Sequence, residues 1–193
     1  IQVQLPEPTD EKSEACKAGY KTIAEIGKER IRRAGKKIAE ENPDKVKELD
    51  LGFKVFKLDS SNIKSWDGNT EDVQQSLLDA VSNIKEERTE EDVLYEILLK
   101  YGLDLTLPIK EKTIEGLTVF NVGFGALFIC LSDNITNKVA EGIGKWLETI
   151  RTEIRENITD KDLVENLIKE TNKCRVIFKD TGFTDVEKTN SVQ

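Results

Sequence analysis

The chain has 193 residues, of which 34% are charged and 37% hydrophobic, and its formal net charge is −8 at pH 7. These values allow one folded domain or one and a half and exclude a disordered chain, and the negative charge argues against general binding to nucleic acid. Histidine is absent, which excludes Ser-His-Asp triads, Cys-His nucleophiles and nearly all zinc catalysis.

Cysteine use indicates a reducing compartment, and hydropathy indicates no membrane-spanning segment. Cys16, Cys130 and Cys174 are odd in number and far apart, and no C-x-x-C pair occurs, which is typical of free thiols in a cytosolic protein. No apolar run approaches the ~18 residues that a membrane-spanning helix needs, and no signal peptide is visible. We therefore expect a cytoplasmic protein with no membrane partner and no bound metal.

The first third of the chain has the pattern of a strand, a helix and a second strand. Residues 1–6 alternate apolar and polar side chains until a Pro-Glu-Pro segment ends the strand. Apolar residues then recur three and four apart over residues 19–41, which predicts a helix with one buried stripe. Residues 53–59 alternate again and end at Asp59. This order predicts a βαβ unit with parallel strands.

A polar loop over residues 60–69 marks the predicted boundary between two domains, 1–68 and 69–193. In the second domain, Thr89 and Asp92 form a capping-box pattern, and a Gly-Phe-Gly turn between apolar runs predicts a β-hairpin. The predicted helices lie at 70–85, 89–101 and 136–155, from 159 or 160, and from 184 or 185. The predicted strands lie at 103–109, 118–122, 126–131 and 175–178.

The predicted hairpin is apolar on both faces, which requires cover on both sides. The helices at 70–85, 90–101 and 137–155 can cover one side fully and the other in part. The remaining apolar surface predicts self-association by symmetric pairing. The competing expectation is a monomer in which residues 1–59 fold back as the missing cover.

Several long segments resemble, in the same order, the C-terminal portion of the methylation subunit of Type III restriction–modification systems. The first of them begins VQLPEPTDEKSEACKAGY and the second is LGFKVFKLDSSNIKSW. The matching segments are residues 3–38, 51–66, 88–109 and 175–190. Those subunits are adenine-N6 DNA methyltransferases that use S-adenosylmethionine. The resemblance implies an α/β fold: a partial Rossmann-like methyltransferase βαβ unit, followed by a small α/β C-terminal domain with a β-hairpin.

The resemblance also implies that the chain is an excised part of such an enzyme. In the family, an Asp-Pro-Pro-Tyr motif and a target-recognition region precede a Phe-x-Gly-x-Gly cofactor loop, and the VQLPEP strand follows it. Neither motif occurs here, so no catalytic residue is assigned. We expect the chain alone to be inactive and to bind S-adenosylmethionine weakly or not at all. The parent's implied partners are DNA, the restriction (helicase/nuclease) subunit and a second copy.

Two carboxylates are candidate cofactor ligands. In Rossmann-like folds, an acidic residue at the carboxyl end of the second strand accepts hydrogen bonds from ribose hydroxyls. Glu7, between Pro6 and Pro8, matches this position, and the alternative is a solvated glutamate in a rigid turn. Asp59 ends the next strand, at the edge where the family places the adenine of the cofactor. Its alternative is a helix or turn cap with Ser60.

The helix at 19–41 is locally basic in an acidic chain. Between positions 21 and 37, seven lysines and arginines stand against two glutamates. Arg30, Arg32 and Arg33 are therefore candidates for contact with DNA phosphate. The alternative is a solvated charged face.

Two further hypotheses stand beside that of a methyltransferase part, and the first of them is compatible with it. In one, residues 70–193 form a dimerisation or restriction-subunit docking module without chemistry of its own. In the other, the chain is an unrelated α/β enzyme with a complete site. The second is disfavoured because histidine, a phosphate loop and a nucleophile pattern are all missing.

Overall fold

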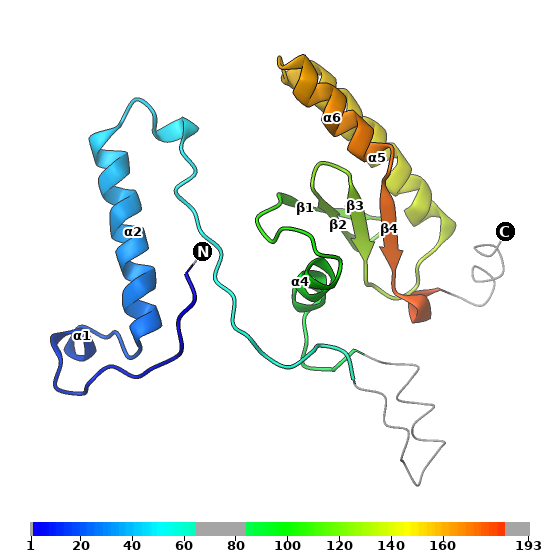
Figure 1. The fold of residues 1–193 in the computed structure, drawn as a ribbon. Coiled ribbons are helices and arrows are strands. Elements are labelled where there is room, and N and C mark those ends of the chain that lie inside the picture. The colour runs from blue at the N-terminus through cyan, green and yellow to red at the C-terminus, as the bar shows by residue number, and fades with distance from the viewer. Residues whose placement is uncertain (1, 65–83, 184–193) are drawn as a thin grey trace, which may run out of the picture. The chain divides into compact units, whose positions relative to one another are not determined.

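The computed structural model describes residues 2–64 and 84–183 (Figure 1). The chain divides into two compact units, residues 1–57 and 58–193. None of the described helices combines the length and the apolar character that crossing a lipid bilayer requires.

Three sequence predictions fall mainly outside the described residues. They are the domain boundary at 68/69, the helix from 184 or 185, and all but the end of the helix at 70–85. At that end, Ile84 pairs with Ile63 in an isolated β-bridge rather than in a helix. The boundary and the remainder of these helices stay predictions.

The first unit is built on one long helix, α2, which spans Ile23–Glu41. The short helix α1 (Glu14–Lys17) precedes it, and a 3-10 helix, η1 (Val46–Glu48), follows. Helix α2 begins where it does because Thr22 and Glu25 form a capping box, in which each side chain accepts the other's backbone N–H at 3.3 Å. The predicted helix is confirmed, although it starts four residues later than the sequence pattern suggested.

The two strands predicted at 1–6 and 53–59 do not form in the described residues of those ranges. Their apolar side chains are exposed instead, Val3 by 89%, Leu5 by 68% and Phe56 by 47%. Parallel strands need a sheet that is covered on both faces, and the described residues of this unit contain no sheet. The prediction of these strands, and with it of a βαβ unit in the isolated chain, is wrong.

The segments that flank α2 instead lie along the helix where it carries glycine. A Cβ atom added at Gly27 would lie 3.1 Å from Nε2 of Gln2, and one added at Gly35 would lie 3.6 Å from the carbonyl oxygen of Leu51. A Cβ atom at Gly35 would be in ordinary van der Waals contact, whereas one at Gly27 would require the end of the Gln2 side chain to shift slightly. Even so, no described residue of this unit is buried, and the apolar stripe predicted to be buried on α2 stays open to solvent.

The second unit contains a four-stranded mixed sheet in the order β1-β2-β3-β4. Strands β1 (Ile109–Ile114), β2 (Leu117–Val122) and β3 (Leu127–Cys130) form an antiparallel meander. Strand β4 (Arg175–Phe178) pairs parallel to β3. The hairpin of β2 and β3 and the last strand were predicted, and both are confirmed.

Helices cover both faces of this sheet. Helices α5 (Asn137–Asn157) and α6 (Lys161–Thr171) lie on one face, and α4 (Glu90–Lys100) lies on the other, as Figure 1 shows. On the α5 side the core contains Val119, Phe128, Cys130, Val139, Ile143, Trp146, Ile150 and Ile154. On the α4 side it contains Val93, Leu94, Leu98, Phe120, Val122, Leu127, Ile129 and Leu131. These helices are confirmed, with Thr89 and Asp160 as their predicted caps on α4 and α6.

Because both faces of the sheet are covered, the uncovered apolar surface that predicted self-association is not found on the hairpin. Phe120 and Phe128 point to opposite faces of the sheet and are 7% and 0% exposed. The hairpin therefore leaves no apolar face open for a second copy. Self-association stays a prediction, but it no longer follows from the hairpin.

The strand predicted at 103–109 is wrong, and β1 takes its place later in the chain. Asp104 accepts the N–H of Thr106 on its side chain at 2.8 Å and that of Leu107 on its carbonyl at 3.2 Å. This turn ends at Pro108, which has no N–H to donate to a ladder. The strand begins at Ile109 and its outer residues are charged, which is typical of an edge strand.

Candidate functional site

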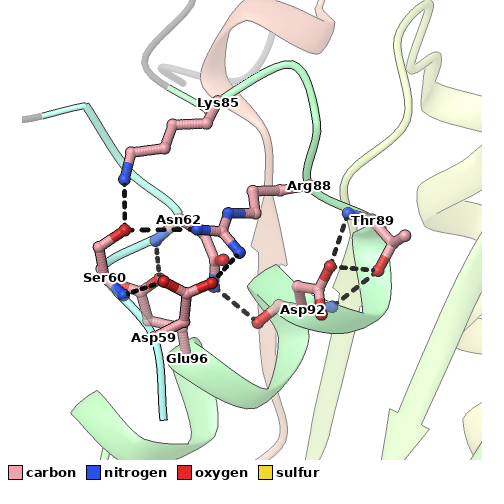
Figure 2. A network of polar contacts seen from close by, with 8 residues as sticks. All are labelled: Asp59, Ser60, Asn62, Lys85, Arg88, Thr89, Asp92 and Glu96. Carbon is pink, nitrogen blue, oxygen red and sulfur yellow. Dashed lines mark hydrogen bonds and ion pairs between the residues drawn. The ribbon is translucent and has the colours of Figure 1, made fainter. Parts of the chain in front are cut away.

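A polar network surrounds Asp59, one of the two predicted cofactor ligands (Figure 2). It joins the segment around residues 59–63 to the start of helix α4. Thr89 begins this helix by a capping box with Asp92, and it accepts the N–H of Asp92 at 3.1 Å. The cap fixes the residue before it, Arg88, which reaches back to the segment.

Asp59 is held by two donors. Its Oδ2 accepts from Nη1 of Arg88 at 2.9 Å, and its Oδ1 accepts the N–H of Ser60 at 2.6 Å. The Asp59 side chain is 62% exposed, whereas that of Arg88 is 16% exposed. The bond from Arg88, and then that from Ser60, lower the pKa of Asp59 from 3.8 to about 2. The carboxylate is therefore charged, and the turn contact with Ser60 considered from the sequence is present.

Glu96 anchors the same segment from the middle of α4. It accepts from the Ser61 hydroxyl, from the N–H of Asn62 at 2.7 Å and from Nζ of Lys100 at 2.8 Å. Burial of Glu96 opposes its ionisation, but the bonds from Lys100, Ser61 and Asn62 outweigh burial and lower its pKa from 4.5 to about 2. Asp59 and Glu96 stay ionised near neutral pH, so the network fastens the segment rather than transferring protons.

We expect Glu96→Gln to lower the free energy of unfolding by about 1–2 kcal/mol at neutral pH, because charge-assisted hydrogen bonds are lost. The pKa of Glu96 is lower in the folded chain, so its contribution is present above pH 4.5 and is lost as the pH falls through about 2. Urea denaturation from neutral pH down to about pH 2 measures this difference, which should shrink toward acid. The exposed Glu91→Gln, on the same helix, is the matched control and should change the free energy little. A difference for Glu96→Gln that does not vary with pH would contradict the assignment.

Glu7 lies in a segment fixed against the start of α2. Its carbonyl accepts the N–H of Ile23 at 3.0 Å, and Pro8 pairs with Thr22 in an isolated antiparallel bridge. The N–H of Thr9 continues this pairing to the carbonyl of Lys21 at 3.0 Å. The backbone around Glu7 is therefore held, while its side chain is exposed. Glu7 belongs to the first unit and Asp59 to the second.

The three candidate DNA-binding arginines differ in their contacts, although all are exposed on α2. Arg33 bonds to Glu29 at 2.8 Å and to the Tyr20 hydroxyl at 3.3 Å. Arg32 lies over the Phe53 ring, 5.8 Å from its centroid. Arg30 and Arg33 are one turn apart and share a side of the helix, whereas Arg32 faces another. The structure thus groups two of the three.

Sequence patterns did not identify Arg88, Glu96 or Lys85 as members of a site. Lys85 donates to the Ser60 hydroxyl at 2.9 Å. No motif distinguishes these side chains from other charged surface residues, because their partners lie 25 to 35 positions away along the chain. Only the capping-box pattern of Thr89 and Asp92 indicated a fixed helix start here. Within the described ranges, no group of three or more Cys, Asp or Glu side chains has the arrangement of a metal site.

Comparison with known proteins gives one informative similarity. No family model matches this chain. Over 58 residues, the chain is 48% identical to the Mod subunit of the Type III restriction-modification enzyme EcoP15I from Escherichia coli. The match covers 30% of this chain and 8% of that subunit. Part of the chain is thus related to a Type III Mod subunit, of which it spans a small share.

Proposed function

We propose that the chain is the C-terminal part of an S-adenosylmethionine-dependent adenine-N6 DNA methyltransferase from a Type III restriction–modification system. The observation that carries the proposal is the 48% identity over 58 residues to a Mod subunit. The ordered resemblance of the longer segments described above supports it. The matched region is a small share of the relative. The methyltransferase activity, the use of S-adenosylmethionine and the binding of DNA and of the restriction subunit are therefore all part of this proposal.

The solvent exposure of the first unit supports this proposal independently of sequence identity. None of its described residues is buried, and the apolar residues of its two alternating segments are exposed. An apolar alternation has a physical use only when one or both faces are covered. In the proposed parent, the cofactor-domain sheet would pair with these segments and cover α2. Residues 1–68 would then be the end of the cofactor domain and residues 69–193 an accessory domain.

Within this proposal, Glu7 accepts hydrogen bonds from the ribose hydroxyls of the cofactor. Its side chain is exposed, and its backbone is fixed by the bond from the N–H of Ile23. Asp59 lies near the cofactor's adenine as a charged acceptor that Arg88 orients. Arg30, Arg32 and Arg33 contact DNA phosphate, with Arg30 and Arg33 acting from one side of α2.

The proposal is tested with this chain and with a longer chain that includes the Asp-Pro-Pro-Tyr and Phe-x-Gly-x-Gly motifs. Calorimetric titration with S-adenosylmethionine and transfer of a labelled methyl group to adenine in DNA are measured for both. The longer chain should bind the cofactor and methylate DNA. This chain should not methylate DNA, because the platform for the flipped adenine is missing, and it should bind the cofactor weakly or not at all, because the Phe-x-Gly-x-Gly loop is missing. Methyl transfer by this chain alone, or none by the longer chain, would overturn the proposal.

In the longer chain, Glu7→Ala should weaken binding of S-adenosylmethionine by about 1–3 kcal/mol, because the ribose hydroxyls lose a charged acceptor. Glu7→Gln should weaken it less, since one acceptor oxygen remains. Glu11→Ala, which removes a nearby exposed carboxylate, is the matched control and should leave the dissociation constant unchanged. If Glu7→Ala binds the cofactor as tightly as the unmodified chain, Glu7 is not part of the site.

A further inference from the structure

An open groove lies where the end of α5 meets α6, on the helical hairpin that Figure 1 shows beside the sheet. Its volume is about 700 Å³. Ile158, in the connection between the helices, and Val164 and Ile168, on α6, form its half-buried apolar floor. Val164 and Ile168 are four residues apart, so they project from the same side of α6. The floor is therefore a short apolar stripe at helical spacing.

The rim of this groove is cationic. Arg155, Lys161 and Lys169 line it and are exposed, with Glu165 as the acidic residue among the lining side chains. None of the three cations forms an ion pair with another described residue. Other cations of the same helical pair differ in this respect, since Arg151 is paired with Glu148. The groove lining thus has three cations against one carboxylate, on a chain whose net charge is −8.

We propose that this groove binds an acidic amphipathic helix of a protein partner. Apolar residues of that helix, repeating three and four apart, would pack on the floor. Its carboxylates would meet the cations of the rim, where complementary charge selects the partner and its orientation. Nucleic acid fits the site less well, because the floor is aliphatic and the lining contains no aromatic side chain on which a base could stack. The proposal does not depend on the methyltransferase assignment.

The probe is a fluorescein-labelled helical peptide built from Leu, Ala and Glu, with Leu at the three-and-four repeat. Its counterpart with Lys in place of Glu and a short duplex DNA are the comparison ligands. Fluorescence anisotropy on the full chain measures affinity, and ¹⁵N chemical-shift changes locate the bound peptide. The acidic peptide should bind and change the chemical shifts of Val164 and Ile168. The lysine peptide lacks the complementary charge and the DNA lacks the apolar repeat, so both should bind at least about tenfold more weakly.

Charge reversal at the rim provides the decisive comparison. The double variant Lys161→Glu, Lys169→Glu should weaken binding of the acidic peptide by about tenfold or more. The matched control, Lys138→Glu with Lys145→Glu, reverses two exposed lysines of α5 outside the groove lining and should change affinity less than about twofold. Circular dichroism confirms that both variants are folded. The proposal is overturned if the acidic peptide does not bind, or if both double variants lose affinity for it equally. It is also overturned if the rim variant loses affinity for DNA rather than for the acidic peptide.

Discussion

Replacing Phe128 by alanine is expected to lower the free energy of unfolding of the second unit by about 3–5 kcal/mol. Phe128 is fully buried in β3, and its ring forms a T-shaped contact with that of Trp146 on α5, with centroids 5.3 Å apart. The substitution removes this contact and leaves a cavity between the sheet and the helix, and the neighbouring strands can close it only in part. Urea denaturation followed by far-UV circular dichroism measures the loss.

The matched control is Phe124→Ala, the same change at the tip of the β2–β3 turn. Phe124 is 43% exposed and has a positive φ of 60°. Alanine keeps most of the backbone cost of that conformation and loses little packing, so we expect a change of less than about 1 kcal/mol. Equal losses for the two variants would contradict the placement of Phe128 at the centre of the core.

The same burial decides how self-association must be measured. A polar residue at Phe120 or Phe128 would disrupt the fold of the monomer, so a change in oligomeric state would not report on an interface. Sedimentation equilibrium on the unmodified chain avoids this problem, and a monomer at tens of micromolar would reject self-association of this chain.

Replacing Gly142 by alanine is expected to destabilise the second unit by about 1–3 kcal/mol, whereas Gly144→Ala should stabilise it by about 0.5–1 kcal/mol. Both glycines lie inside α5. A Cβ atom at Gly142 would overlap with Cγ2 of Ile114, a β-branched side chain that packs in the core, while a Cβ atom at Gly144 meets nothing within 4 Å. At the second site, only the higher helix propensity of alanine acts.

Thermal denaturation of the two variants in parallel measures both changes in stability, and each variant is the control for the other. The helix, the substitution and the intrinsic propensity are shared, so the opposite signs arise from the contact of α5 with Ile114 on β1 alone. A stabilisation by both substitutions would show that α5 does not pack on β1 at this point.

The elements that the sequence predicted correctly are those specified by neighbouring residues. Helix α4 has its capping box in Thr89 and Asp92, and α5 carries an apolar stripe from Val139 to Ile154 at helical spacing. The β2–β3 hairpin has glycines at positions 123 and 125, where the backbone takes φ angles of 65° and 91°. Each of these signals is local, so none of them depends on contacts with distant parts of the chain.

The elements that the sequence failed to predict depend on partners elsewhere. The alternation at residues 1–6 and 53–59 is typical of strands, but an alternating segment becomes a strand only when a neighbouring strand accepts its hydrogen bonds. Strand β1 was missed for the opposite reason. Its charged Lys110, Glu111 and Lys112 have low strand propensity, yet the tight turn at Glu115 and Gly116 pairs it with β2.

The candidate site follows the same division. Glu7 and Asp59 could be selected from the sequence, because each ends a strand-like pattern. The partners of Asp59 could not, since Arg88 comes within 2.9 Å of it only through the start of α4. Such a pairing between distant positions carries no signal in a single sequence.

The parallel pairing of β3 with β4 has a consequence for the order in which the second unit assembles. The β1–β2–β3 meander joins residues that are close along the chain, whereas the first β3–β4 partners, Leu127 and Arg175, are separated by the whole of α5 and α6. Closing that long loop costs entropy before any ladder bond repays it. During synthesis, β1, β2 and β3 leave the ribosome before β4, so the meander can pair first, and until β4 emerges the outer edge of β3 is an unpaired template for other chains.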